Sequence, residues 1–315
     1  MGSCWSVLVF KTRQLKKTPD TKFLSYLKRA DVFFCGFVRY ECEPLQFEGM
    51  RAINRSRKQS MKHKMRVRKR LSLCRQAAKE GDPKAQSYLG YAYDLGLGVK
   101  RNFDQAIFWY RKAAAKGNTI AQYNLGQIYS DNEHGRTNLR KAVTFWRAAA
   151  SNGDAEALCN MGVAYERGAG VRRNFRRAFT FYQKAATHGN YLAKYNLGRC
   201  FAKGVGAKVN ERKANAWFRK AKRSLVSAAK LGNSDAQTCF AVSLRNGWAV
   251  RKNYREAVKW YRKAAKSGHS RAKFCLGLCY KDGEGVRKNR LMAHRYFKEA
   301  AKNGVKEARQ ELQNF

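Results

Sequence analysis

The sequence predicts an all-α solenoid built from helix pairs. Three observations carry this prediction: a repeat of about 36 residues, a 3.6-residue apolar stripe inside each repeat, and cap residues at fixed positions. Periods of 20–50 residues are typical of stacked supersecondary units, because one unit alone cannot bury its apolar face. We place six repeats at residues 83–118, 119–154, 155–190, 191–233, 234–269 and 270–305.

The second half of each repeat carries the clearer helical pattern. In the first repeat, Ala106, Trp109, Tyr110, Ala113 and Ala114 stand at the spacing of one helix face. An Asn precedes this helix in every repeat and a Gly follows it, as helix capping favours. These predicted caps are Asn102, Asn138, Asn174, Asn210, Asn253 and Asn289, and Gly117, Gly153, Gly189, Gly232, Gly268 and Gly304.

The first half of each repeat predicts a shorter helix, and a loop then leads to the second helix. In the first repeat this helix covers residues 85–93, and the loop reads LGLGV. The second repeat lacks these loop glycines at residues 131–135, so we expect a different turn there. Seven extra residues near 222–227 in the fourth repeat should lengthen its second helix by nearly two turns and keep its buried face.

The two ends of the array predict capping helices. Leu71–Asp82 has the pattern of a single second helix, and Lys306–Phe315 begins another first helix and stops. Terminal caps of this kind shield the outermost repeats of a solenoid from water.

The repeated residues match a known pattern over about residues 71–315. It reads A-x-A-x-x-x-L-G-x-x-Y, then G-x-G-V, then K-A-A-x-x-G. This pattern resembles the Sel-like repeat family, whose helix pairs are related to tetratricopeptide repeats. The resemblance implies a right-handed α/α superhelix and an adaptor role in assembly and signalling.

The chain is strongly basic throughout. Its 66 Lys and Arg against 22 Asp and Glu give a net charge of +44. Residues 1–70 contribute +13 of this charge, so residues 71–315 carry +31. The repeat array is therefore basic in its own right, which predicts a polyanionic partner or surface.

Basic residues precede the capping Asn in most repeats, and we call them the basic loop pairs. Because the position recurs once per repeat, they should line one edge of the array, where a polyanion would displace counterions. The alternative interpretation is a solvated loop in a chain that is basic everywhere. The predicted partner-binding residues of this edge are Lys100, Arg101, Arg172, Arg173, Lys208, Arg251, Lys252, Arg287 and Lys288.

A second candidate site is a row of asparagines in the first helices. Asn124, Asn160 and Asn196 each precede the Leu-Gly or Met-Gly pair, and related tetratricopeptide grooves use such residues to hold a peptide backbone. An amide side chain offers both a donor and an acceptor to an extended chain. Tyr123 and Tyr195 stand beside this row and could add apolar contact. A structural hydrogen bond is the alternative role for the asparagines.

The sequence shows no catalytic constellation, and we expect neither an enzyme nor a small-molecule substrate. The five histidines are scattered, and we expect His188 and His269, beside helix-ending glycines, simply to face solvent. The nine cysteines fit no disulfide or zinc framework. Cys275 and Cys279 lie four residues apart, but no further ligand completes a site, so we expect no metal and no cofactor.

The N-terminal part differs from the repeats. We assign residues 1–65 to a basic segment, either a small helical lead-in or poorly ordered, and residues 66–315 to the solenoid. The first six residues fit an N-myristoylation pattern at Gly2, with Cys4 available for palmitoylation. Arg55–Arg70 has nine basic residues in sixteen and could be a nuclear signal, a nucleic-acid arm or a solvated leader.

Together these features predict a non-enzymatic scaffold or adaptor. We expect it to bind a peptide or an acidic protein partner on a basic solenoid surface. The alternatives are a nucleic-acid-associated protein and an acylated protein at an anionic membrane. The apolar run Trp5–Phe10 is too short for a secretory signal, so we expect a cytoplasmic protein, with a nuclear or membrane-peripheral location as alternatives.

Overall fold

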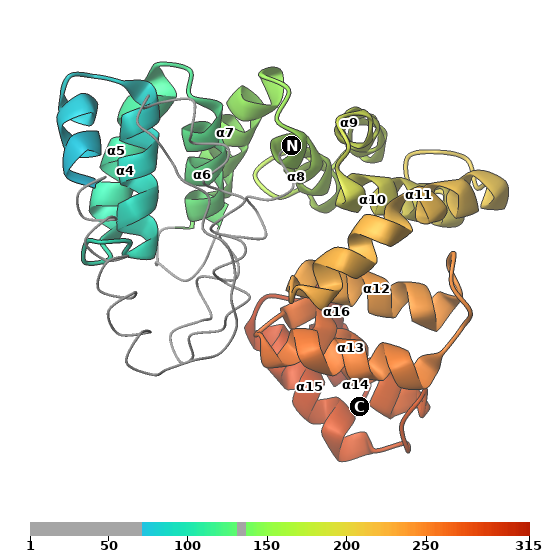
Figure 1. Cartoon of the computed structure of the whole chain (residues 1–315). Helices are drawn as coiled ribbons and strands as arrows, with labels where there is room; N and C mark the ends of the chain where they lie inside the picture. The colour runs from blue at the N-terminus through green and yellow to red at the C-terminus, as the bar shows by residue number, and fades with distance from the viewer. Residues whose placement is uncertain (1–70, 131–136) are drawn as a thin grey trace, which may run out of the picture. The chain divides into compact units, whose positions relative to one another are not determined.

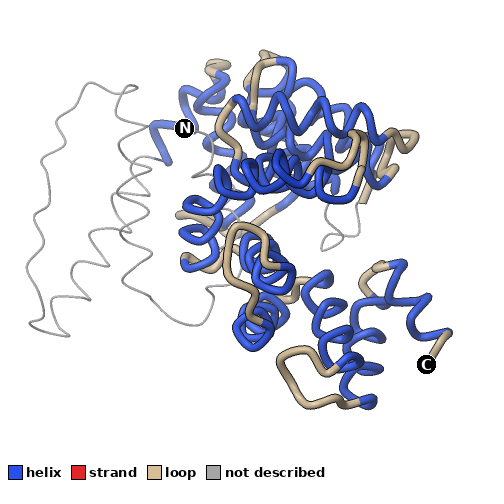
Figure 2. Tube along the Cα trace, turned by 90° about the vertical axis from the view of Figure 1, so that its right-hand side faces the viewer, coloured by secondary structure: helices blue, strands red, loops and turns tan. Residues whose placement is uncertain are grey.

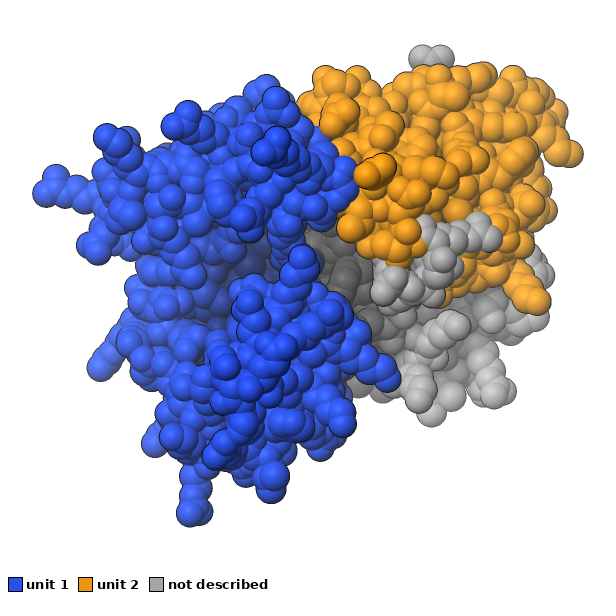
Figure 3. Space-filling model, turned by 180° about the vertical axis from the view of Figure 1, so that it is seen from behind, with its two compact units in different colours: residues 1–14, 155–315 blue, residues 15–154 orange. Residues whose placement is uncertain are grey.

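The computed structural model describes residues 71–130 and 137–315, which form α-helices and loops only (Figure 1). Figure 2 shows the same alternation of helices and loops along the chain. The chain divides into two compact units, coloured separately in Figure 3, and we describe each by itself. The predictions for residues 1–65, for acylation at Gly2 and Cys4 and for the turn of the second repeat lie outside the described residues.

Unit 2, residues 15–154, contains the first two helix pairs. The side chains that residues 71–79 bury pack against the first pair, as an N-terminal cap should. The pairs that follow are α4 (Pro83–Leu95) with α5 (Phe103–Ala115) and α6 (Thr119–Ser130) with α7 (Leu139–Ser151).

Unit 1 contains the remaining four helix pairs and the C-terminal cap, within residues 155–315. Both helices of every pair are where the repeat pattern predicts them. The elements are α8 (Ala155–Arg167) with α9 (Phe175–Thr187), α10 (Tyr191–Lys203) with α11 (Glu211–Lys230), α12 (Ser234–Asn246) with α13 (Tyr254–Lys266), α14 (Ser270–Asp282) with α15 (Arg290–Lys302), and α16 (Lys306–Gln313).

The two helices of a pair approach closely at a glycine. A Cβ atom on Gly162 would lie 2.5 Å from the ring of Tyr182, which is a steric overlap. The first repeat has the same arrangement at Gly90 and the fourth at Gly198. The missing side chain lets an aromatic ring of the second helix lie flat on the first helix, and this contact forms the core of the repeat.

The predicted caps are confirmed. The Asn before each second helix accepts a hydrogen bond from the amide of the third residue that follows it. The glycines after these helices have φ between 77° and 92°, the left-handed conformation that ends a helix without a Cβ penalty.

The insertion in the fourth repeat lengthens α11, as predicted. This helix has 20 residues, whereas the second helices of the other repeats have 13. Its buried residues continue along one face without interruption. No helix in the described part of the chain is long and apolar enough to cross a membrane.

Candidate functional site

The two members of a basic loop pair have different surroundings. Lys100 is exposed to solvent. Arg101 is half-buried, donates a hydrogen bond from Nε to the Asp94 carbonyl oxygen at 2.8 Å, and lies 4.3 Å from the centre of the Phe103 ring. The second cation therefore ties the end of α4 to the start of α5, and the first remains available to a partner.

The ring contact of the second cation recurs in two other repeats, although Arg173 and Lys252 are exposed whereas Arg101 is half-buried. Arg173 lies 5.3 Å from the Phe175 ring, and Lys252 lies 4.6 Å from the Tyr254 ring, both within cation–π range. In each case the ring belongs to the first residue of the following helix. The exposed first members and the single cation of the fourth repeat are Lys100, Arg172, Lys208, Arg251 and Arg287.

At two places in unit 1, a loop glycine lies against the start of the second helix of the preceding repeat. A Cβ on Gly206, in the loop before α11, would overlap the backbone of Phe175 on α9. A Cβ on Gly285, in the loop before α15, would overlap the backbone of Tyr254 on α13. The loop that carries Lys208 therefore contacts the start of α9, which follows Arg172 and Arg173, and the loop that carries Arg287 and Lys288 contacts the start of α13.

A group of charged residues that the sequence analysis missed lies on the first helices of unit 1. Arg199 of α10 forms an ion pair with Glu166 of α8, which also accepts a hydrogen bond from the Tyr182 hydroxyl at 2.7 Å. Burial alone would raise the pKa of Glu166, but the charge of Arg199 and the hydrogen bonds from Tyr182 and Arg199 together outweigh burial and hold this pKa below its usual value. The Nε of Arg199 is buried and bonds no acceptor among the described residues.

Lys203 lies one helical turn beyond Arg199. Partial burial and the charges of Arg199 and Arg271 lower the pKa of Lys203. No acidic side chain in the described part of the chain forms an ion pair with it, whereas Arg271 pairs with Glu307 of α16 at 2.6 Å. Positive charge on α10 and α14 therefore converges without full compensation.

The same face also receives charges from α8 and α12. Arg167, which occupies the Lys203 position one repeat earlier, interacts electrostatically with Asp235 and with Glu307. The charged residues of these first helices are thus close enough to interact electrostatically. We call Arg167, Arg199, Lys203, Asp235 and Arg271 the inner-face cluster.

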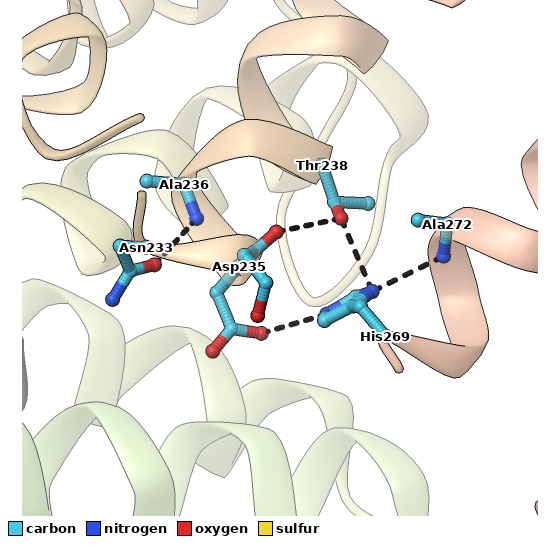
Figure 4. A network of polar contacts seen from close by, with 7 residues as sticks. Asn233, Asp235, Ala236, Thr238, His269 and Ala272 are labelled. Carbon is cyan, nitrogen blue, oxygen red and sulfur yellow. Dashed lines mark hydrogen bonds and ion pairs between the residues drawn. The ribbon is translucent and has the colours of Figure 1, made fainter. Parts of the chain in front are cut away.

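Asp235 belongs to a hydrogen-bond network around His269 (Figure 4). His269 Nδ1 accepts the amide N–H of Ala272 at 3.1 Å and lies 3.1 Å from the Thr238 hydroxyl, so the side chain caps α14. Because Nδ1 is an acceptor, Nε2 carries the proton and donates to Asp235 at 3.0 Å. The expectation that His269 simply faces solvent is wrong, since only 16% of its side chain is exposed.

The acid of this network is stabilised in its charged form. Burial alone would raise the pKa of Asp235, but the hydrogen bond from His269 and the charges of His269 and Arg167 together outweigh burial and lower this pKa. Asp235 therefore carries a negative charge at neutral pH that His269 already engages.

The predicted asparagine row divides into buried and half-buried members. Asn124 is buried and donates to the Tyr110 hydroxyl at 3.2 Å, which is the structural role given as the alternative. Tyr123 and Tyr195 are buried as well. Asn160 and Asn196 are half-buried. Asn196 lies three residues before Arg199 and seven before Lys203, a spacing that places all three on one face of α10 and that the sequence already contains.

The thiols and acidic groups of the described residues give no indication of a reactive or metal-binding site. Burial raises the pKa of Cys239 and of Cys279 to about 12, so both thiols stay protonated at neutral pH and are poor nucleophiles. Across residues 71–130 and 137–315, no three His, Cys, Asp or Glu side chains are grouped so as to hold a metal ion.

The fold and these surfaces define an all-α solenoid of stacked helix pairs. A family model for the Sel1 repeat matches six segments, and the chain belongs to this family. Sel1 repeat proteins are generally non-catalytic scaffolds for protein–protein interactions. The matched segments are residues 83–118, 119–154, 155–190, 192–224, 236–269 and 270–305.

Two solved structures are similar to this chain, and the first of them supports the same class of fold. A Sel1 repeat protein from Oxalobacter formigenes is 28% identical, with 79% of this chain and 97% of that chain covered and a TM-score of 0.54. A protective antigen of uropathogenic Escherichia coli with an SLR fold is 30% identical, with coverage of 77% and 50% and a TM-score of 0.48. The chain thus spans about half the length of that antigen. The comparison with curated proteins gives no match.

Proposed function

We propose that this protein is a scaffold that holds an acidic segment of a protein partner on the inner face of unit 1. The observation that supports this proposal is Lys203, an exposed cation that interacts with the charges of Arg199 and Arg271 and forms no ion pair with an acid among residues 71–130 and 137–315. A carboxylate entering between these groups would relieve their mutual repulsion and gain charge-assisted hydrogen bonds.

The neighbouring groups suit an extended peptide. The side chain of Arg199 is 30% exposed, so part of its guanidinium is open to this face while it pairs with Glu166. Asn196, one turn earlier on the same helix, offers an amide that can both donate to and accept from a peptide backbone. The exposed members of the basic loop pairs add positive potential, which accelerates the approach of an acidic chain and weakens with salt.

The experiment measures binding of a fluorescein-labelled peptide of alternating Glu and Gly to the full chain by fluorescence anisotropy. Its Gln–Gly counterpart serves as the uncharged probe. Lys203→Gln with Arg271→Gln should raise the Kd at least tenfold, as expected for the loss of two close charge contacts.

A matched control variant has the same net charge as the Lys203→Gln, Arg271→Gln double variant. Lys184→Gln with Lys266→Gln removes two exposed cations from the second helices α9 and α13, and it should change the Kd less than about twofold. Equal weakening in both double variants would mean that only overall charge attracts the peptide, and the inner-face proposal would then be wrong.

A further inference from the structure

Helix α11 carries a straight row of four cations on its exposed side. They are Arg212, Arg219, Arg223 and Lys230, all exposed and spaced by seven, four and seven residues. At about 100° per residue these positions fall within roughly 40° of one another. The buried residues of the helix, such as Ala221 and Leu225, lie on the opposite side. With a rise of 1.5 Å per residue the row extends for about 27 Å.

Among the described residues, no acidic side chain neutralises this outer row. The only acidic residue of α11 is Glu211, in its first turn. None of the four cations forms an ion pair with an acid in the described part of the chain. By contrast, Glu299 on the equivalent helix of the sixth repeat pairs with Lys273 at 2.7 Å and Arg295 at 3.3 Å.

Three further cations of α11 lie beside the row and add to its positive charge. Lys213 lies 5.7 Å from the Phe201 ring and Lys220 lies 4.6 Å from the Trp217 ring, so both are held beside the row. Lys222 is also exposed. The long helix therefore presents seven basic residues on its surface.

We propose that the outer row of α11 binds the phosphate backbone of double-stranded nucleic acid without regard to sequence. A duplex carries one negative charge per ~1.7 Å of its axis, so a row of about 27 Å lies opposite roughly sixteen phosphate charges. Each cation finds a phosphate in any register. Three of the four are Arg, whose planar guanidinium forms two parallel hydrogen bonds to a phosphate.

The side chains between the cations favour a duplex over the other polyanions. Ala216 and Ser227 lie on this face, and α11 exposes no large apolar side chain that could enter a membrane. Trp217 is half-buried beside Lys220, so this row offers no free aromatic ring on which single-stranded bases could stack.

The test is fluorescence anisotropy of a fluorescein-labelled 20-base-pair DNA duplex of mixed sequence, titrated with the full chain between 50 and 200 mM salt. Each lost phosphate contact lowers the slope of log K against log salt by about 0.9. The α11 variant combines Arg212→Gln, Arg219→Gln, Arg223→Gln and Lys230→Gln. It should therefore lose up to about 3.6 from this slope and bind the duplex at least tenfold more weakly at 100 mM salt.

A matched variant removes four exposed cations from other second helices and should change the slope by less than about 1. Equal losses in both variants, or tighter binding of a 20-nucleotide single strand than of the duplex, would overturn the proposal. So would duplex binding that the α11 variant leaves unchanged, or phosphatidylserine vesicles that bind the chain when the duplex does not. The control combines Arg176→Gln, Lys184→Gln, Lys266→Gln and Lys302→Gln.

Because Lys203 and Arg271 are untouched in the α11 variant, it should still bind the Glu–Gly peptide. Normal helical content by circular dichroism and an unchanged urea midpoint together show that the variant is folded, whether or not the peptide binds. The two proposals can therefore fail independently.

Discussion

His269 Nε2 lies 3.0 Å from Asp235 Oδ1, and this hydrogen bond joins α12 to the N-terminal cap of α14, the first helix of the next repeat. The imidazole simultaneously caps α14 through Nδ1. An equivalent bond joins Asn190, which caps α10, to Glu156 of α8 at 2.9 Å. In both places the residue that caps a first helix also contacts an acid of the preceding first helix, so local capping and repeat stacking are coupled.

Substitution of His269 tests this double role. His269→Ala removes the cap and the bond to Asp235, and it should lower the free energy of unfolding by about 1–2 kcal/mol. His269→Asn should retain most of the stability, because Asn caps the equivalent helices α10 and α12. Urea denaturation of both variants measures the difference. Equal losses for Ala and Asn would show that the cap bond is not what His269 contributes.

Stability should fall in acid because of Glu166. Its pKa is lowered in the folded state from a usual value near 4.5, so the unfolded chain binds its proton at higher pH than the folded chain does. The stabilisation is therefore present above about pH 4.5 and is lost as pH falls through the folded pKa. Urea midpoints at pH 7, 5 and 3.5 should show this loss.

Glu166→Gln provides the control for the acid effect. The variant should be less stable than the parent at pH 7, because Arg199 loses its partner carboxylate. It should also lose less stability between pH 5 and pH 3.5. An identical pH dependence in the two proteins would mean that other carboxylates account for the effect.

The close approach of paired helices makes the inner glycines sensitive to a single methyl group. Gly162→Ala places a Cβ at 2.5 Å from the Tyr182 ring, so one of the helices must shift. We expect a loss of about 1–3 kcal/mol in the free energy of unfolding, typical of overpacking. Calorimetry or urea denaturation measures it, and a loss below about 0.5 kcal/mol would contradict the proposed contact.

The basic loop pairs should separate into structural and binding members. Arg101→Gln should destabilise the chain by about 1 kcal/mol, because its bond to the Asp94 carbonyl and its contact with Phe103 are lost. Lys100→Gln should leave stability unchanged within about 0.5 kcal/mol and slow the association of the Glu–Gly peptide. Stopped-flow binding and thermal denaturation distinguish the two. Equal stability losses would remove the distinction.

Residues whose role depends on helical periodicity could be predicted from the sequence. Asn102 and its equivalents cap their helices, and the longer α11 keeps its buried face, because both follow from local spacing. The inner-face cluster could not be predicted, since Lys203 and Arg271 are 68 residues apart and only the stacking of repeats brings their charges together. The burial of the asparagine row could not be predicted either. Asn124 and Asn196 occupy the same repeat position, yet Asn124 is buried and Asn196 is half-buried.

The central claim is that a protein partner lies on the inner face of unit 1. Site-specific photo-cross-linking tests it most directly, with benzoylphenylalanine at Asn246 or at Thr180 in the full chain. Asn246 is exposed and stands at the Lys203 position of the fifth repeat, whereas Thr180 is exposed on the second helix α9. We expect the photo-reactive residue at position 246 to cross-link an acidic peptide of the partner. This adduct should disappear in the Lys203→Gln, Arg271→Gln double variant. Adducts from position 180 alone would contradict the account.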